Sequence, residues 1–164
     1  MGRRLGTQRG VTLVELVVTV SILALLASVV LPLSWMTGQR VRELELRRNL
    51  RIIRTAIDDY KKAYDKAVEE RKIIAAAAKS GYPKDLETLV TGDDFGGAYR
   101  VRQRFLRRIP PDPMNPPRGN DPPAWGLRSY SDSPDAGTWG REDVFDVYSL
   151  SNGVSIDGTR YRDW

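Results

Sequence analysis

The sequence predicts an α+β fold in which a long N-terminal helix, half in a membrane and half amphipathic, packs on a small antiparallel β-sheet. Three observations predict this fold. An uncharged run of 24 residues, Leu16 to Gln39, leads into a charged, helix-forming region that carries one apolar stripe. A proline-rich stretch follows. Short segments of alternating pattern and two Asx-Gly turns complete the chain.

The composition excludes several kinds of active site. The 164 residues leave room for one domain and a modest extra segment. The chain has no Cys and no His, which excludes disulfides, thiolate nucleophiles, imidazole bases and the usual zinc or iron ligands. The formal charge of +5, from 26 Lys and Arg against 21 Asp and Glu, selects no partner by itself.

The uncharged run is long enough to cross a bilayer, because a spanning helix needs about 20 residues. A secretory signal has a shorter apolar region of about 7 to 15 residues. A buried core helix is the other alternative, but so small a domain would hardly bury a helix that is apolar on every side. We therefore expect one membrane-spanning helix.

Two residues are unusual for a plain membrane anchor. Glu15 stands at the head of the run, where an unpaired carboxylate at bilayer depth costs about 2.5–3.5 kcal/mol. A place in the headgroup zone beside the helix N-terminus is the alternative that the run leaves open. Pro32 removes a backbone hydrogen bond, so we expect the helix to bend or unwind near residues 29–33.

From Arg40 to about Lys79 the chain has neither Gly nor Pro, which favours a continuing helix. Its apolar residues recur at spacings of three and four and form one stripe: Leu46, Leu50, Ile53, Ile57, Tyr60 and Tyr64. A coiled coil is the alternative, but only about two and a half heptads are clean. The stripe therefore predicts packing within the chain, against a sheet.

The C-terminal half reads as loops and strands. Seven of the ten prolines lie in residues 110–123, which predicts an ordered loop. Two segments have strand-like patterns, Trp125–Tyr130 and Val144–Leu150. Two tight turns then return the chain through Thr159–Trp164, which predicts a small antiparallel meander.

The segment Arg9 to Glu15, behind a basic leader and directly before the apolar run, resembles the leader junction of type IV pilins and type II secretion pseudopilins. The resemblance implies that prepilin peptidase cuts between Gly10 and Val11 and that Val11 is N-methylated. Val11 stands where the family usually has Phe. The resemblance also implies that Glu15 neutralises the N-terminal amine of a neighbouring subunit and that Pro32 marks a bend on assembly.

The same resemblance divides the chain into three parts. Residues 1–10 would be the cleaved leader, and residues 11–37 the transmembrane and polymerisation helix. Residues 38–164 would be a periplasmic globular domain with the type IV pilin fold, including the amphipathic half of the helix at about 40–79. The mature chain would then have 154 residues and a formal charge of +2, because three arginines leave with the leader.

Three further motifs resemble this family, and the last two resemble the major pseudopilin of the secretion G type. They are a Tyr-Pro turn before a Leu-rich helix at 82–90, the proline element at 109–113, and the strand at 143–151. A proline-rich ligand for an aromatic groove is the alternative for the second motif. The stretch around residues 65–80 has no counterpart in the resemblance and reads as an insertion.

Pseudopilins of this type bind calcium in the loop after that strand. The oxygen-bearing candidates in this chain are Asn152, Ser155, Asp157 and Asp163. Asx and Gly residues are also what plain turns require, so calcium is one of two open interpretations. If calcium is bound, its removal with EGTA should lower the melting temperature of the domain.

We therefore expect a structural subunit, not an enzyme, in the bacterial inner membrane and in a periplasmic pseudopilus that supports protein export. The implied partners are further copies of the chain, other pseudopilins, prepilin peptidase and the inner-membrane assembly platform. No cofactor is required, and nucleic acid is not expected, because much of the basic excess lies in the leader. The alternatives are a type IV pilin for adhesion, motility or DNA uptake, and a membrane-anchored periplasmic enzyme using carboxylates.

Overall fold

The computed structural model describes residues 10–70 and 80–164, and within helix α1 it leaves the side chains of residues 29–36 undescribed. The chain divides into two compact units, residues 1–38 and residues 39–164. Helix α1, Leu13–Glu69, contributes to both. Helix α1 is continuous through residues 29–33, so the unwinding expected near Pro32 does not occur, and a bend there stays a prediction. The predicted helix up to about Lys79 also runs into residues 71–79, which lie outside the described ranges.

The core of the second unit confirms the predicted stripe. Leu46, Ile53 and Ile57 are fully buried, and Leu50 and Tyr60 nearly so. Tyr64 packs on the edge of the same cluster. The stripe therefore packs within the chain, as expected, and not in a coiled coil. Its partners come from both halves of the remaining chain: Leu86, Leu89, Phe95, Leu106, Trp125, Val144, Val147 and Tyr161.

The sheet has two short antiparallel strands, β1 (Gly126–Arg128) and β2 (Asp146–Tyr148). The register pairs Leu127 with Val147. Both strands lie inside the segments predicted from the sequence. Gly126 is required opposite Tyr148, because a Cβ there would come within 2.3 Å of the tyrosine ring.

The predicted return strand at Thr159–Trp164 is wrong. Only one isolated bridge forms, between Val154 and Arg160, and the chain then enters the 3₁₀ helix η1, Tyr161–Asp163. Both aromatic residues of this segment contact α1 or its side chains, and they stand three residues apart. A 3₁₀ turn places residues i and i+3 on one side, whereas a strand would point them to opposite faces.

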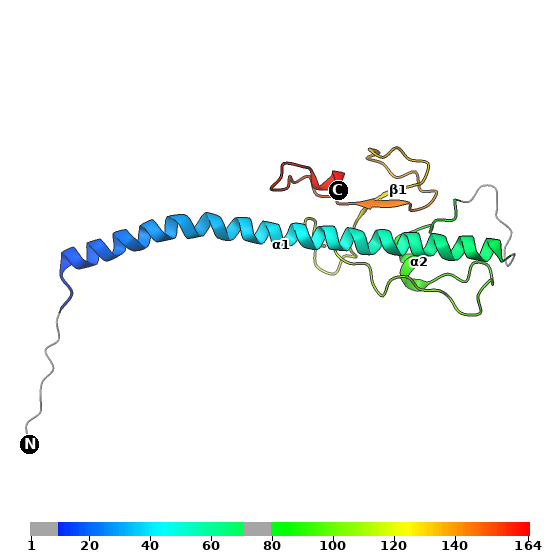
Figure 1. The fold of residues 1–164 in the computed structure, drawn as a ribbon, viewed down its shortest axis with the longest axis horizontal. Coiled ribbons are helices and arrows are strands. Elements are labelled where there is room, and N and C mark those ends of the chain that lie inside the picture. The colour runs from blue at the N-terminus through cyan, green and yellow to red at the C-terminus, as the bar shows by residue number, and fades with distance from the viewer. Residues whose placement is uncertain (1–9, 71–79) are drawn as a thin grey trace, which may run out of the picture. The chain divides into compact units, whose positions relative to one another are not determined.

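The second unit has two layers on opposite sides of α1 (Figure 1). The sheet and η1 lie on one side. On the other side lie the short helix α2, Leu86–Thr91, and the chain that follows it. Asp85 caps α2 by accepting a hydrogen bond from the Thr88 amide at 2.8 Å, which confirms the helix predicted after the Tyr-Pro turn.

The proline-rich loop is ordered, as predicted, and contains no helix or strand. Its centre is Asp112, whose side chain is fully buried. The Asp112 carboxylate accepts hydrogen bonds from the Met114 amide at 2.8 Å and from the Ser149 hydroxyl at 2.6 Å. Asn49 on α1 donates to the Pro111 carbonyl at 2.9 Å. The loop is thereby tied both to the end of β2 and to α1.

The two neighbouring isoleucines of α1 give a matched test of this packing. Ile53 is fully buried and Ile52 is 38% exposed. Ile53→Ala should lower the free energy of unfolding by about 2–5 kcal/mol, because it leaves a cavity in the core. Ile52→Ala should cost clearly less. Urea unfolding of residues 39–164 measures both, and equal losses would contradict the packing described here.

Candidate functional site

Helix α1 begins with a side-chain cap. The Glu15 amide donates to the Thr12 hydroxyl at 3.2 Å, and the Leu16 amide donates to the Thr12 carbonyl at 3.0 Å. Thr12 is therefore the N-cap, and Glu15 holds the third position of the first turn. A carboxylate there is favoured by the partial positive charge of the helix N-terminus.

The predicted cleavage site, Gly10–Val11, lies just before this cap. Neither residue is helical, and both are exposed. A Cβ placed on Gly10 would meet no heavy atom within 4 Å. The peptide bond is therefore open to a protease, and no contact within the described chain requires glycine at this position. The basic leader itself, residues 1–9, lies outside the described ranges.

The first unit exposes an apolar helix surface. Large apolar side chains from Val11 to Leu26 are all at least half exposed, on every side of the helix. A contiguous apolar surface of this kind marks contact with a membrane or with another protein. In the described parts of the chain, no helix meets the length and apolarity that a membrane span requires.

Residues 5–31 match the family model described as the prokaryotic N-terminal methylation motif. This is a type IV pilin-like signal. It indicates processing by prepilin peptidase, and it does not distinguish a pilin from a pseudopilin. The match spans the cleavage site, Glu15 and the start of the apolar helix. No curated protein and no solved structure matched the chain.

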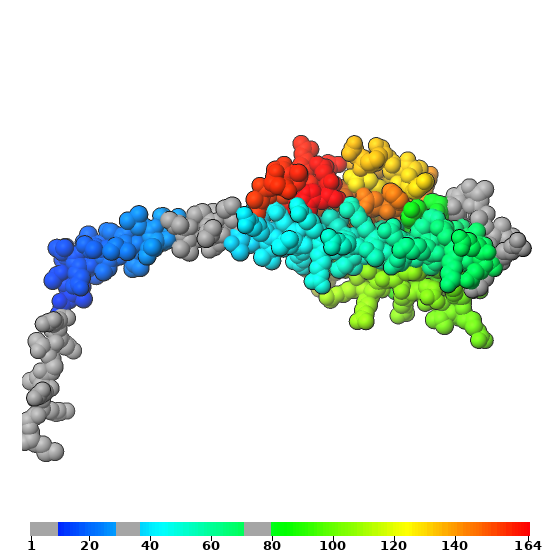
Figure 2. Space-filling view, viewed as in Figure 1, coloured from blue at the N-terminus to red at the C-terminus, as the bar shows by residue number. Residues whose placement is uncertain are grey.

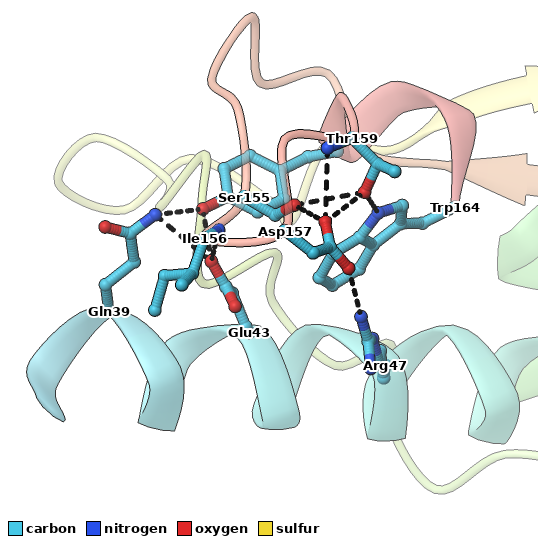
Figure 3. A network of polar contacts seen from close by, with 9 residues as sticks. Gln39, Glu43, Arg47, Ser155, Ile156, Asp157, Thr159 and Trp164 are labelled. Atoms are coloured by element: carbon cyan, nitrogen blue, oxygen red, sulfur yellow. Dashed lines mark hydrogen bonds and ion pairs between the residues drawn. The ribbon is translucent and has the colours of Figure 1, made fainter. Parts of the chain in front are cut away.

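In the second unit, a network of polar contacts joins α1 to the C-terminal loop (Figure 3). Gln39, Glu43 and Arg47 recur every four residues and so share one face of α1. The Glu43 carboxylate accepts from the Ile156 amide and the Tyr161 hydroxyl, both at 2.9 Å. Gln39 also donates to the Tyr161 hydroxyl oxygen, at 3.0 Å.

Arg47 is the third residue of α1 that contacts the C-terminal loop. Its guanidinium lies 3.4 Å from the Asp157 carboxylate and 4.2 Å from the centre of the Trp164 ring. Asp157 in turn accepts hydrogen bonds from the hydroxyls of Ser155 and Thr159 and from the Thr159 amide. These hydrogen bonds, that of Ser155 first, lower the pKa of the Asp157 carboxyl to about 2, and the Arg47 cation adds to the effect.

Of the four calcium candidates, the structure brings two together. Ser155 and Asp157 share the loop network, whereas Asn152 and Asp163 lie outside it and are exposed. Within residues 10–70 and 80–164, no group of three or more Asp and Glu is placed to hold a metal ion. The Asp157 oxygens already have hydroxyl, amide and guanidinium partners. Calcium binding stays a prediction.

An enzyme without His or Cys could use the carboxylate pairs Asp132 with Asp135 and Glu142 with Asp143, and three of these four have structural partners in the described chain. Asp132 accepts from the Ser129 and Gly140 amides at 2.7 and 3.0 Å, which lowers the pKa of its carboxyl. Asp143 is buried and accepts from the Tyr130 amide at 2.9 Å and from the Ser80 hydroxyl. Glu142 accepts from the Ser131 hydroxyl at 2.9 Å. These hydrogen bonds hold the loop that joins β1 to β2.

Sequence reasoning missed Arg54. Its guanidinium donates to the Asp146 carboxylate at 2.7 Å, to the Val147 carbonyl at 3.0 Å and to the Trp164 carbonyl at 2.8 Å. One side chain of α1 thus holds both β2 and the C-terminal residue. Arg54 stands seven residues after Arg47 and so shares its face of the helix, but this spacing does not indicate which carboxylate or carbonyls it meets.

The lowered pKa of Asp157 predicts a pH dependence of stability. A carboxyl whose pKa is lower in the folded state stabilises the fold above its unfolded value of about 3.9, and this stabilisation is lost as the pH falls toward 2. Melting temperatures of residues 39–164 between pH 5 and pH 2 should therefore fall less for Asp157→Asn than for the parent. Parallel curves would contradict the assignment. Ser155→Ala, which removes the strongest hydrogen bond to Asp157, should give an intermediate slope.

Proposed function

We propose that the chain is a structural subunit of a type II secretion pseudopilus. Prepilin peptidase cuts it between Gly10 and Val11 and methylates Val11. The apolar half of α1 anchors it in the bacterial inner membrane by a single span, with residues 38–164 in the periplasm. Copies then polymerise through this helix, with other pseudopilins and the assembly platform, into a fibre that supports protein export. The subunit has no catalytic role and needs no cofactor.

One observation carries the proposal: a processing signal stands directly before a capped helix whose apolar surface has no partner in the described chain. A simple anchor would need the apolar surface but not the signal. A cleaved secretory signal would remove the apolar surface, whereas the cut at Gly10 retains it. Retention of an apolar helix after processing is what assembly through that helix requires.

Glu15 fits this role on physical grounds. Cleavage creates a positive amine on Val11, beside the N-terminus of α1, where the helix dipole is also positive. Packing several such ends together in an apolar fibre core is unfavourable unless a carboxylate accompanies each amine. Glu15, exposed on the first turn, supplies one carboxylate per copy. A buried ionic contact of this kind can fix the register between neighbours.

A type IV pilin is the second candidate, and the same signal supports it. The pseudopilin is favoured by the two motifs in the second unit that resemble the secretion G type. The proline element and the strand motif touch each other, because Ser149 of the strand donates to the buried Asp112 of the proline element. The two motifs therefore act as one structural element.

Replacing Gly10 tests the cleavage site. Gly10→Leu should keep the leader attached, because the peptidase requires a small residue there, while the open surroundings of Gly10 leave the fold unchanged. The N-terminus and intact mass of membrane fractions, with and without co-expressed prepilin peptidase, measure this. Val11→Phe, which restores the usual residue of the resembling family, is the control and should be cut. A product of Gly10→Leu that begins at Val11 would contradict the site.

Replacing Glu15 tests the assembly role. Glu15→Val should leave membrane insertion and cleavage intact but reduce sheared fibres at least about tenfold, because amines in the fibre core lose their partner. Electron microscopy and immunoblots of sheared fractions measure the yield. Glu87→Val, the same change at an exposed position of α2, is the control and should assemble normally. Normal fibres from Glu15→Val would refute the role.

A further inference from the structure

A strongly basic segment lies on the α2 side of the second unit. Residues 95–111 contain five arginines and no acid: Arg100, Arg102, Arg104, Arg107 and Arg108. All five are exposed, and none forms an ion pair with a residue in the described ranges. We call residues 100–108 the basic ribbon. An exposed cluster of this density attracts anionic groups and surfaces.

The basic ribbon is held in place by its backbone. The amides of Phe105 and Leu106 both donate to the Leu89 carbonyl of α2 at 2.9 Å. Gln103 exchanges two backbone hydrogen bonds with Asp93, at 2.8 and 3.1 Å. Gly92, with φ of +83°, allows the basic ribbon to lie close to its backbone, because a Cβ there would lie 2.9 Å from Arg104 Cγ. A fixed backbone lowers the ordering cost of binding a partner.

Next to the ribbon is an open groove with a volume of about 680 Å³, which we call the basic groove. Arg107 and Arg108 line it together with Arg48 of α1, and one acid, Glu45, lies among them. Two apolar side chains of α1 also line it, Leu44, which is 66% exposed, and Ile52. A matching partner therefore offers carboxylates around an apolar or aromatic group.

The sheet side of the same unit has the opposite charge. Residues 129–164 contain seven acids and three arginines, a net charge of −4. Within it lies an acidic aromatic surface made of Tyr130, Asp132, Asp135, Glu142 and Phe145. The Tyr130 side chain is 63% exposed and its ring centre lies 5.4 Å from that of Phe145. Asp135 and Glu142 are exposed in the same loop, and Glu142 accepts from the hydroxyl of Ser131, next to Tyr130.

The two surfaces lie on opposite sides of α1. Arg54 contacts β2, whereas Asn49 contacts the loop after the basic ribbon. At about 100° per residue, Asn49 lies roughly 140° around the helix from Arg54. The space-filling view agrees, since the segment that contains residues 100–108 lies on one side of α1 and residues 145–164 on the other (Figure 2).

We infer that the basic groove of one copy receives the acidic aromatic surface of the next copy. This inference rests on the proposed polymerisation and names a contact between its globular domains. Two complementary surfaces on opposite sides of one subunit make a head-to-tail contact between copies. Repetition of this contact gives an open filament when the copies do not close into a ring. The exposed tyrosine fits the apolar lining of the groove, and the carboxylates around it fit the arginines. Nucleic acid is less suited, because the ribbon exposes no aromatic ring on which bases stack.

Charge reversal with compensation tests the contact in the full chain, co-expressed with prepilin peptidase and a pilin assembly machinery. Arg107→Glu with Arg108→Glu should reduce sheared fibres about tenfold or more, and Asp135→Arg with Glu142→Arg should do the same, because like charges then face each other. The four changes together should restore fibres. The control is Lys84→Glu with Arg118→Glu, which changes the net charge by the same amount at two exposed sites outside both surfaces. This variant should assemble normally.

Disulfide trapping supplies a second readout, because the chain has no cysteine. Leu44→Cys with Tyr130→Cys should give a ladder of oxidised multimers in fibres, whereas either change alone should not. Fibres without the ladder, or full assembly of the Arg107→Glu/Arg108→Glu variant, would overturn the inference. If that variant instead loses only binding to DNA or to anionic vesicles, the groove serves those partners and the inference is also wrong. An uncleaved parent chain that forms no fibres would refute the proposed function itself.

Discussion

The buried stripe of α1 is the constraint on which the second unit depends. Two strands of three residues each are too short to be stable alone in water. They are held because Val144 and Val147 reach the same apolar cluster as Ile53 and Ile57. Since α2 and the proline loop pack on the other side of this helix, no layer of the domain has a core of its own. Disturbing α1 therefore disturbs every layer at once.

Polar contacts then determine where each loop lies against the helix. Arg54 holds β2 and the chain end, Asn49 holds the proline loop, and Glu43 holds the turn before η1. Glu43 and Arg54 lie on the same face of α1, whereas Asn49 lies roughly 140° around the helix from Arg54. The helix therefore carries apolar packing along one stripe and positioning contacts on its flanks.

Much of this could be predicted from sequence, because the signals were local or periodic. The stripe and the positions of both strands follow from spacing and alternation, whereas the helix after Tyr82-Pro83 was expected only from the resemblance. The return strand is wrong because it was inferred from the two Asx-Gly turns, whereas Tyr161 and Trp164 are spaced for a 3₁₀ turn. The roles of Arg54 and Asp112 were missed, because a charged residue gives no sign in sequence of which distant carbonyl or hydroxyl it will meet. The opposite charges of the two sides of α1 could not be predicted either, because they depend on which segments the fold places on each side. The net charge of the whole chain does not show this difference.

The position of the Thr12 cap has a consequence for the proposed processing. The groups that cap α1 in the described chain, Thr12 and Glu15, both follow the proposed cut at Gly10, so the cap would be kept after cleavage. The proposed processing would then add a positive charge at the chain end without removing the groups that begin the helix.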